Sequence, residues 1–259
     1  MYTKYDYWIF RGSIDEKVCS DIIEIGRSQI EQEKNIGVDV TGLTGGNSEK
    51  TDDDVRLALG DRTLQQAKKE FGLTEENIYK KTYIRDSEIT WLNRNKYDWI
   101  YSTIIDHVNQ ANFDAGWRYD IDSYDDIQFT TYRPGGFYGW HPDGGSDHFA
   151  KLKRDIPGVI PNEEKRRFTH TKSADRVGKI RKLSVTVNLN SGDEYMGGDL
   201  KFSLDEHQTK YDSKELIIEE AKQPGTVIVF PSYKYHCVTP ITHGIRYSLV
   251  LWMYGRPFK

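Results

Sequence analysis

The chain has 259 residues, of which 37% are hydrophobic and 13% aromatic, and this length can bury one substantial core. We therefore expect a single globular domain over residues 1–259. The net charge of −4 argues against a uniformly basic nucleic-acid binder, and the absence of an apolar run of about 18 residues argues against a membrane span.

The N-terminus and the cysteines limit the compartment and the metal chemistry. The opening MYTKYDYWIFRG lacks the basic region and apolar stretch of a secretory signal, so we expect a cytoplasmic protein. Cys19 and Cys237 are too few for a disulfide framework or a thiolate cluster. Metal ligands would therefore be nitrogen and oxygen atoms, and we expect Cys237 to be a packing residue.

After an initial strand, the first 115 residues are predicted to be mainly helical support. Ser13 and Glu16 have the spacing of a capping box, and the apolar residues that follow recur at three- and four-residue intervals. This pattern predicts a helix over about 14–30. A continuous apolar stripe after Asn95 predicts the longest helix of the chain.

Two less regular segments separate these helices. Residues 40–54 are rich in Gly, Ser, Thr and Asp without periodicity, which predicts a loop. Residues 62–70 are predicted to be a second, partly helical segment.

From residue 117 the pattern changes to short β-type runs, which are 117–121, 127–133, 183–190, 198–203, 215–218, 226–230 and 245–253. Helices first and short strands afterwards predict an α+β chain. We expect residues 116–259 to form an antiparallel sandwich or barrel, with the early helices packed on one sheet.

A basic insertion, 144–182, interrupts the predicted strands. Residues 148–182 hold eleven Lys and Arg against four Asp and Glu, a net charge of +7 in a chain that is acidic overall. A solvated surface is the ordinary reading of such a run. The alternative is a lid that binds an acidic or phosphorylated partner.

The stretch FYGWHPDGG places His141 and Asp143 two positions apart, just past a predicted strand. On an extended chain the side chains at i and i+2 point the same way, so both can reach one metal ion. Alone, the pair also fits a polar turn. Tyr138 and Trp140 would either flank this site or belong to the core.

A third ligand has several candidates among the remaining histidines. His236 is preferred because a short excursion after a predicted buried strand brings it in just before the next strand, although His243 competes. Two histidines and one carboxylate form the facial triad of non-haem Fe(II) oxygenases. Zinc hydrolases can use the same ligand types.

Arg246 favours an Fe(II) oxygenase over a zinc hydrolase. On the predicted strand 245–253 it shares a face with Ser248 and Trp252. A buried arginine needs an anionic partner, and an arginine with a hydroxyl two residues on resembles a carboxylate clamp. Alternation alone also permits the opposite orientation, with Arg246 facing solvent.

Several motifs in order resemble the Fe(II)/2-oxoglutarate-dependent dioxygenases, and closely their prolyl 4-hydroxylase-like, PKHD-type branch. They cover about residues 80–258 in pieces, as IRDSEITWL, QFTTYRPGGFYGWHPD, RKLSVTVNLN, YMGGDLKF and QPGTVIVFPSYKYHCVTPITHGIRYSLVLWMYG. The resemblance implies a double-stranded β-helix, an open jelly roll with the metal near its mouth.

The resemblance also assigns roles residue by residue. His141, Asp143 and His236 fall on the iron ligands, and Arg246 on the residue that binds the distal carboxylate of 2-oxoglutarate. Tyr132 matches a strand tyrosine of the same pocket. In the cosubstrate pocket we also place Ser248 and Asn188, although Asn188 stands where the family often has an aromatic residue.

The predicted function is Fe(II)- and 2-oxoglutarate-dependent hydroxylation of a prolyl or related residue in a peptide or protein, using O2 and releasing succinate and CO2. Ascorbate is a further cofactor that the resemblance suggests. The alternatives are the same chemistry on a free amino acid, a small metabolite or an alkylated nucleobase, and a jelly-roll binding module without turnover. The basic insertion would be the feature that attracts a nucleic acid.

Overall fold

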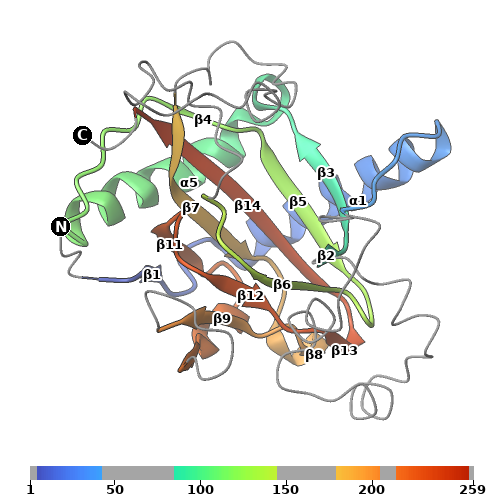
Figure 1. Ribbon diagram of the computed structural model, residues 1–259. Helices are drawn as coiled ribbons and strands as arrows, with labels where there is room; N and C mark the ends of the chain where they lie inside the picture. The colour runs from blue at the N-terminus through green and yellow to red at the C-terminus, as the bar shows by residue number, and fades with distance from the viewer. Residues whose placement is uncertain (1–4, 43–84, 145–178, 205–213, 257–259) are drawn as a thin grey trace, which may run out of the picture.

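The computed structural model describes residues 5–42, 85–144, 179–204 and 214–256 (Figure 1). The predicted helical segment 62–70 lies outside these residues. So do most of the predicted loop 40–54 and most of the basic insertion.

Two antiparallel sheets form the body of the protein. The major sheet has the order β1 (Trp8–Phe10), β11 (Val227–Pro231), β7 (Ile180–Asn188), β14 (Arg246–Gly255), β5 (Ile127–Tyr132) and β3 (Glu88–Leu92), with β4 (Ser123–Tyr124) beside β14. The minor sheet has the order β10 (Glu215–Ile217), β9 (Leu200–Ser203), β12 (His236–Val238), β6 (Phe137–His141) and β2 (Arg85–Asp86). β8 (Tyr195–Gly197) and β13 (Ile241–Gly244) pair separately.

The strands of the major sheet alternate between two environments. On β5, Phe129 faces a cluster that contains helix residues, whereas Tyr132 belongs to a second cluster with Phe202, Phe230 and Val238. The second cluster joins the two sheets, so the core is a jelly-roll-like sandwich, as the sequence predicted.

Two helices cover the outer face of the major sheet (Figure 1). α1 (Glu16–Asn35) begins after Asp15, whose carboxylate accepts a hydrogen bond from the Lys17 N–H at 2.8 Å. The N-cap is therefore Asp15, and the predicted capping box that starts at Ser13 is wrong. α5 (Arg94–Asp114) buries the predicted apolar stripe, which includes Ile100, Tyr101, Ile104, Val108 and Ala111.

The predicted strand 117–121 is wrong. Arg118 has a φ of 54°, which a strand does not allow. The side-chain amide of Asn112 also forms hydrogen bonds with both backbone groups of Tyr119. It donates to the carbonyl and accepts from the N–H, each at 2.9 Å. With those groups satisfied by α5, the segment cannot enter a β-ladder, and β4 forms two residues later.

Residues 85–92 form strands that the propensity pattern did not predict. β2 pairs with β6 at the edge of the minor sheet, and β3 pairs with β5 at the edge of the major sheet. The first 115 residues therefore supply strands to both sheets as well as helices. The last part of the basic insertion is also strand, since Arg181 and Lys182 belong to β7 and Lys182 is buried.

In the described part of the chain, no helix is both long and apolar enough to cross a membrane.

Gly26 marks the closest approach of α1 to the major sheet. A Cβ atom at this position would lie 2.4 Å from the Phe129 ring. We expect Gly26→Ala to lower the free energy of unfolding by about 1–3 kcal/mol, because overpacking outweighs the gain in helix propensity. Urea denaturation would measure the change. Glu31→Ala, at an exposed position of the same helix, is the control, and an equal or higher stability of Gly26→Ala would contradict the packing described.

Candidate metal centre

The pairing of β12 with β6 places two histidines face to face. His236 is the direct register partner of His141, and the centroids of the two imidazole rings lie 4.3 Å apart. The two residues are 95 positions apart in the chain, so only the sheet brings them together. Both side chains are close to fully buried, with 11% and 9% of their surfaces exposed.

Asp143 completes a three-residue cluster two positions beyond the end of β6. Its carboxylate oxygens lie 3.5 Å from His141 Nε2 and 3.6 Å from His236 Nε2. All three ligand atoms lie within 4.8 Å of one another. The neighbouring Gly144 N–H donates to the Ser232 carbonyl at 2.6 Å, which ties this turn to the loop before β12.

The chemistry of the donor set fits a divalent metal ion. His141 Nδ1 lies 2.7 Å from the Gly139 carbonyl, and His236 Nδ1 lies 2.9 Å from the Lys234 carbonyl. Carbonyls accept only from protonated nitrogen, so in the neutral form of each imidazole the lone pair is on Nε2. His141 Nε2 is buried without a hydrogen-bond partner among the described residues, as expected of a ligand atom.

The protonation states in this cluster suit metal binding. Burial, with a contribution from His141, lowers the pKa of His236 to about 4. Burial raises the pKa of Asp143, but His236, His141 and Arg181 together outweigh it and hold that pKa far below the usual range. At neutral pH the cluster therefore offers a neutral imidazole and a carboxylate, the forms in which these groups bind metals.

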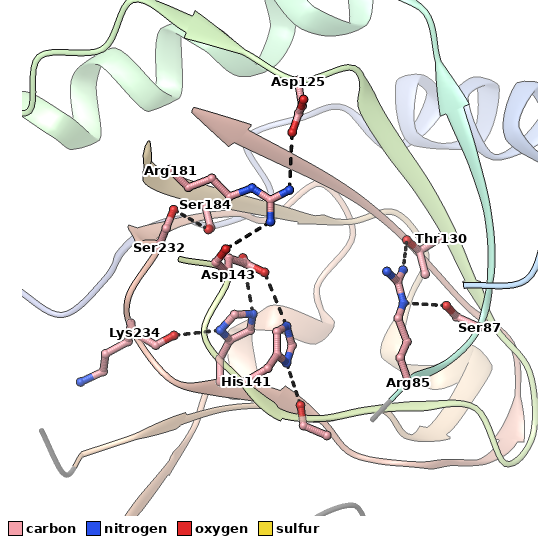
Figure 2. Close-up of polar contacts among 12 residues, drawn as sticks. Arg85, Ser87, Asp125, Thr130, His141, Asp143, Arg181, Ser184, Ser232 and Lys234 are labelled. Carbon is pink, nitrogen blue, oxygen red and sulfur yellow. Dashed lines mark hydrogen bonds and ion pairs between the residues drawn. The ribbon is translucent and has the colours of Figure 1, made fainter. Parts of the chain in front are cut away.

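Arg181 holds Asp143 from the side opposite His141 (Figure 2). Its Nη1 donates to the Asp143 carbonyl at 3.1 Å, and its Nε donates to the Tyr254 hydroxyl at 3.0 Å. The Tyr254 hydroxyl donates in turn to Asp125 at 2.7 Å. Sequence reasoning counted Arg181 with the basic insertion and missed this role, although the residue lies in the RKLSVTVNLN motif.

Arg246 lies in the same cavity with its side chain buried. It is 2% exposed, and its Nη1 donates to the Ser248 hydroxyl at 3.2 Å, while Nε has no hydrogen-bond partner in the described part of the chain. The solvent-facing alternative is therefore wrong. A buried guanidinium whose one side-chain hydrogen bond among the described residues is to a neutral hydroxyl suits a carboxylate ligand.

Some of the other predicted site residues line the cavity and others do not. Tyr132, Tyr138, Ser248 and Trp252 line it together with the metal cluster and Arg246, and the Tyr138 ring stacks 3.5 Å from the ring of His141. Trp140 is not among the lining residues.

Asn188 was predicted to lie in the cosubstrate pocket, but it does not line the cavity. Its Nδ2 donates to the Asn190 carbonyl at 2.6 Å, and its Oδ1 accepts from the Tyr195 hydroxyl at 3.2 Å. The Asn188 side-chain amide is therefore used in hydrogen bonds within the core. His243, the competing third ligand, is exposed on β13 and lies outside the cluster.

The sequence profile of the 2OG-Fe(II) oxygenase superfamily matches residues 127–254, which include all three cluster residues and Arg246. The chain belongs to this superfamily. The resemblance drawn from the sequence motifs is thereby confirmed. The family uses Fe(II), 2-oxoglutarate and O2, and the cluster and the buried arginine described above fit the first two.

Curated relatives of this chain match it over part of their length. A PKHD-type hydroxylase of Klebsiella pneumoniae is 29% identical over 128 residues, which is 48% of this chain and 41% of the relative. One of Stenotrophomonas maltophilia is 30% identical over 131 residues, or 49% of this chain and 41% of the relative. The matched region thus spans about two fifths of these relatives.

Solved structures share the fold of this chain at low sequence identity. A prolyl 4-hydroxylase of Pseudomonas putida superposes with a TM-score of 0.51 at 16% identity, over 98% of this chain and 94% of the other. A prolyl hydroxylase of Trichoplax adhaerens, in complex with a hypoxia inducible factor peptide fragment, gives 0.52 at 14% identity, over 96% and 83%. These likenesses support the jelly-roll-like architecture.

We expect His141→Ala, Asp143→Ala and His236→Ala each to abolish tight Fe(II) or Co(II) binding. Their loss should exceed the roughly 10–100-fold cost of removing only a hydrogen bond to a ligand. Anaerobic titration with Co(II), followed by its visible absorption, would measure the affinities. His243→Ala is the matched control and should keep full affinity; the reverse pattern for His236 and His243 would identify His243 as the ligand instead.

Arg181→Gln should lower metal affinity by about 10–100-fold, because the Asp143 carbonyl loses the donor that orients this turn. The same Co(II) titration measures it. Lys179→Gln, which removes a pair with Asp122 near the surface, is the control. An unchanged affinity in Arg181→Gln would show that the turn is held by Gly144 alone.

Proposed function

We propose that this chain is an Fe(II)- and 2-oxoglutarate-dependent dioxygenase that hydroxylates an unactivated C–H bond of a prolyl or related residue in a peptide or protein. The observation that carries the proposal is one cavity that holds both the His141, Asp143 and His236 cluster and the buried Arg246. A site for metal alone has no need of the arginine.

Each side chain has a definite task in this proposal. His141, Asp143 and His236 would hold the ion on one face and leave the opposite positions open for 2-oxoglutarate and O2. Arg246 and Ser248 would bind the distal carboxylate of 2-oxoglutarate, and Tyr132, whose ring lies 5.6 Å from the Arg246 guanidinium carbon, would line that pocket. When bound, the metal with 2-oxoglutarate and O2 supplies the oxidising power, while the protein orients the substrate and excludes side reactions.

The prolyl assignment is supported by the names of similar proteins. The curated relatives are PKHD-type hydroxylases, and two solved structures of the same fold are prolyl hydroxylases, one of them with a peptide bound. A peptide or protein is therefore the proposed partner. Use of ascorbate and a cytoplasmic location stay predictions from the sequence.

The reaction class is tested by succinate formation from 2-oxoglutarate under air with anaerobically loaded Fe(II). We expect turnover that rises with proline-containing peptides and is lost in His141→Ala. Mass spectrometry of native proteins after incubation would then identify products that have gained one oxygen atom. Absence of succinate across peptides, free amino acids and alkylated nucleobases would leave the jelly-roll binding module as the function.

Arg246→Gln should raise KM for 2-oxoglutarate by roughly 30-fold or more, since it removes one side of a buried charge pair. Ser248→Ala should raise it only about two- to ten-fold, the effect of one neutral hydrogen bond. Initial rates of succinate formation against 2-oxoglutarate concentration measure both. Arg133→Gln, on an exposed arginine paired with Glu88, is the control, and an unchanged KM in Arg246→Gln would contradict the assignment.

A further inference from the structure

A second buried arginine lines the metal cavity. Arg85 on β2 is 6% exposed and lines the same cavity as the metal cluster and Arg246. Its side chain reaches from the minor sheet to the major sheet, where Nη2 donates to the Thr130 hydroxyl at 3.3 Å, and Nε donates to the Ser87 hydroxyl at 2.9 Å (Figure 2). The residue lies in the IRDSEITWL motif, but sequence reasoning gave it no role.

No carboxylate among the described residues forms an ion pair with Arg85. Its partners there are two neutral hydroxyls and the Tyr138 ring, whose centroid lies 4.8 Å from the guanidinium carbon. Neutral groups do not offset the cost of removing a positive charge from water, so such a cation requires an anionic ligand. Arg246 is also buried in this cavity with a hydroxyl partner, which raises the local positive potential further.

The proposed cosubstrate does not supply an anionic partner for Arg85. In that proposal 2-oxoglutarate uses its oxo-acid end at the metal and its distal carboxylate at Arg246, so neither end remains. Arg246 comes from β14 in the major sheet and lies against Tyr132. Arg85 comes from the opposite sheet and lies over Tyr138, whose ring stacks on His141. The two guanidiniums therefore approach the cavity from different sides.

Two further polar atoms in the cavity also lack partners. Gln128 Oε1 and Trp252 Nε1 are buried without a hydrogen-bond partner in the described part of the chain, and both residues line the cavity. They offer one acceptor and one donor. The Trp252 ring lies 6.0 Å from the ring of Trp91, which is 44% exposed, so this wall leads from the cavity toward the surface.

We propose that Arg85 binds a carboxylate of the primary substrate, with Gln128 and Trp252 available to its amide or amine groups. This inference rests on the proposed function and specifies its substrate class: a peptide or amino acid with a free carboxylate close to the hydroxylated carbon. The carboxylate can belong to an acidic side chain of a peptide or to a free amino acid, and the experiment separates these sources.

The binding test needs no turnover. Protein loaded with Mn(II) and saturated with N-oxalylglycine, an inert analogue of 2-oxoglutarate, is titrated with carbon-13-labelled acetate, and the paramagnetic relaxation of the carboxylate carbon is measured. We expect saturable relaxation in the parent protein, weakened about ten- to hundred-fold in Arg85→Gln, the effect of one charged hydrogen-bonding group. Acetamide should show none. Arg133→Gln is the matched control and should behave as the parent.

Three outcomes of this test would overturn the proposal. The first is absence of saturable acetate relaxation in the parent protein, and the second is equal relaxation in Arg85→Gln. The third is a loss of N-oxalylglycine affinity in Arg85→Gln as large as that in Arg246→Gln, which would place Arg85 in the cosubstrate site. Thermal unfolding without ligands adds a readout: a purely structural Arg85 predicts a lower melting temperature for Arg85→Gln, whereas an unpaired cation predicts an equal or higher one.

Succinate formation with acid and amide pairs identifies the source of the carboxylate. L-proline against L-prolinamide tests a free amino acid, and capped peptides that contain Pro-Asp against Pro-Asn test an acidic side chain. We expect the acid of one pair to stimulate turnover at least ten-fold more than its amide in the parent, and Arg85→Lys to keep part of that preference. Equal stimulation by acids and amides would overturn the proposal. Arg85-dependent acetate binding without any succinate would instead overturn the proposed function and leave the carboxylate site standing.

Discussion

The antiparallel register of β12 against β6 is the constraint on which the candidate site depends. It sets His236 directly opposite His141, and the turn after β6 then brings Asp143 between the two Nε2 atoms. A slip of one residue would point a histidine to the other face of the sheet. Each Nδ1 also donates a hydrogen bond to a backbone carbonyl, which fixes the orientation of both imidazoles further.

Buried positive charge is the second organising feature. Arg246 and Arg85 enter one cavity from opposite sheets, and each contacts a hydroxyl where a folded protein would ordinarily place a carboxylate. Such cations cost folding free energy unless a ligand compensates them. The core therefore gives up stability at the place where the proposed anionic ligands would bind, a common trade between stability and function.

Arg181 shows how the rest of the fold supports this site. Its guanidinium bridges the Asp143 carbonyl to Tyr254 and Asp125, and lies 4.3 Å from the centre of the Trp252 ring. The major sheet thus positions Asp143, a candidate metal ligand that follows strand β6 of the minor sheet. Because α1 and α5 pack on the outer face of the major sheet, the helices support the metal centre without contacting it.

Much of the fold and part of the site could be predicted from local sequence. Alternation along 245–253 put Arg246 and Ser248 on one face, and the His-x-Asp spacing paired His141 with Asp143, because both patterns depend only on the geometry of an extended chain. The apolar stripe of α5 was readable for the same reason. The motif order then pointed to the superfamily that the profile match confirms.

Other features depended on neighbours far away in the chain. Residues 117–121 have strand propensity but form no strand, because the Asn112 side-chain amide makes the hydrogen bonds of the Tyr119 backbone. Asn188 does not line the predicted pocket, because its side-chain amide is hydrogen-bonded to Tyr195 and Asn190. Strand register places His236, and not His243, beside His141 and Asp143. Arg85 and Arg181 come to face the candidate site only because the two sheets face each other. By itself, the sequence determined which chemical groups are available and their local direction. The tertiary structure decided which of them share a cavity, because that depends on pairing between strands that the sequence separates.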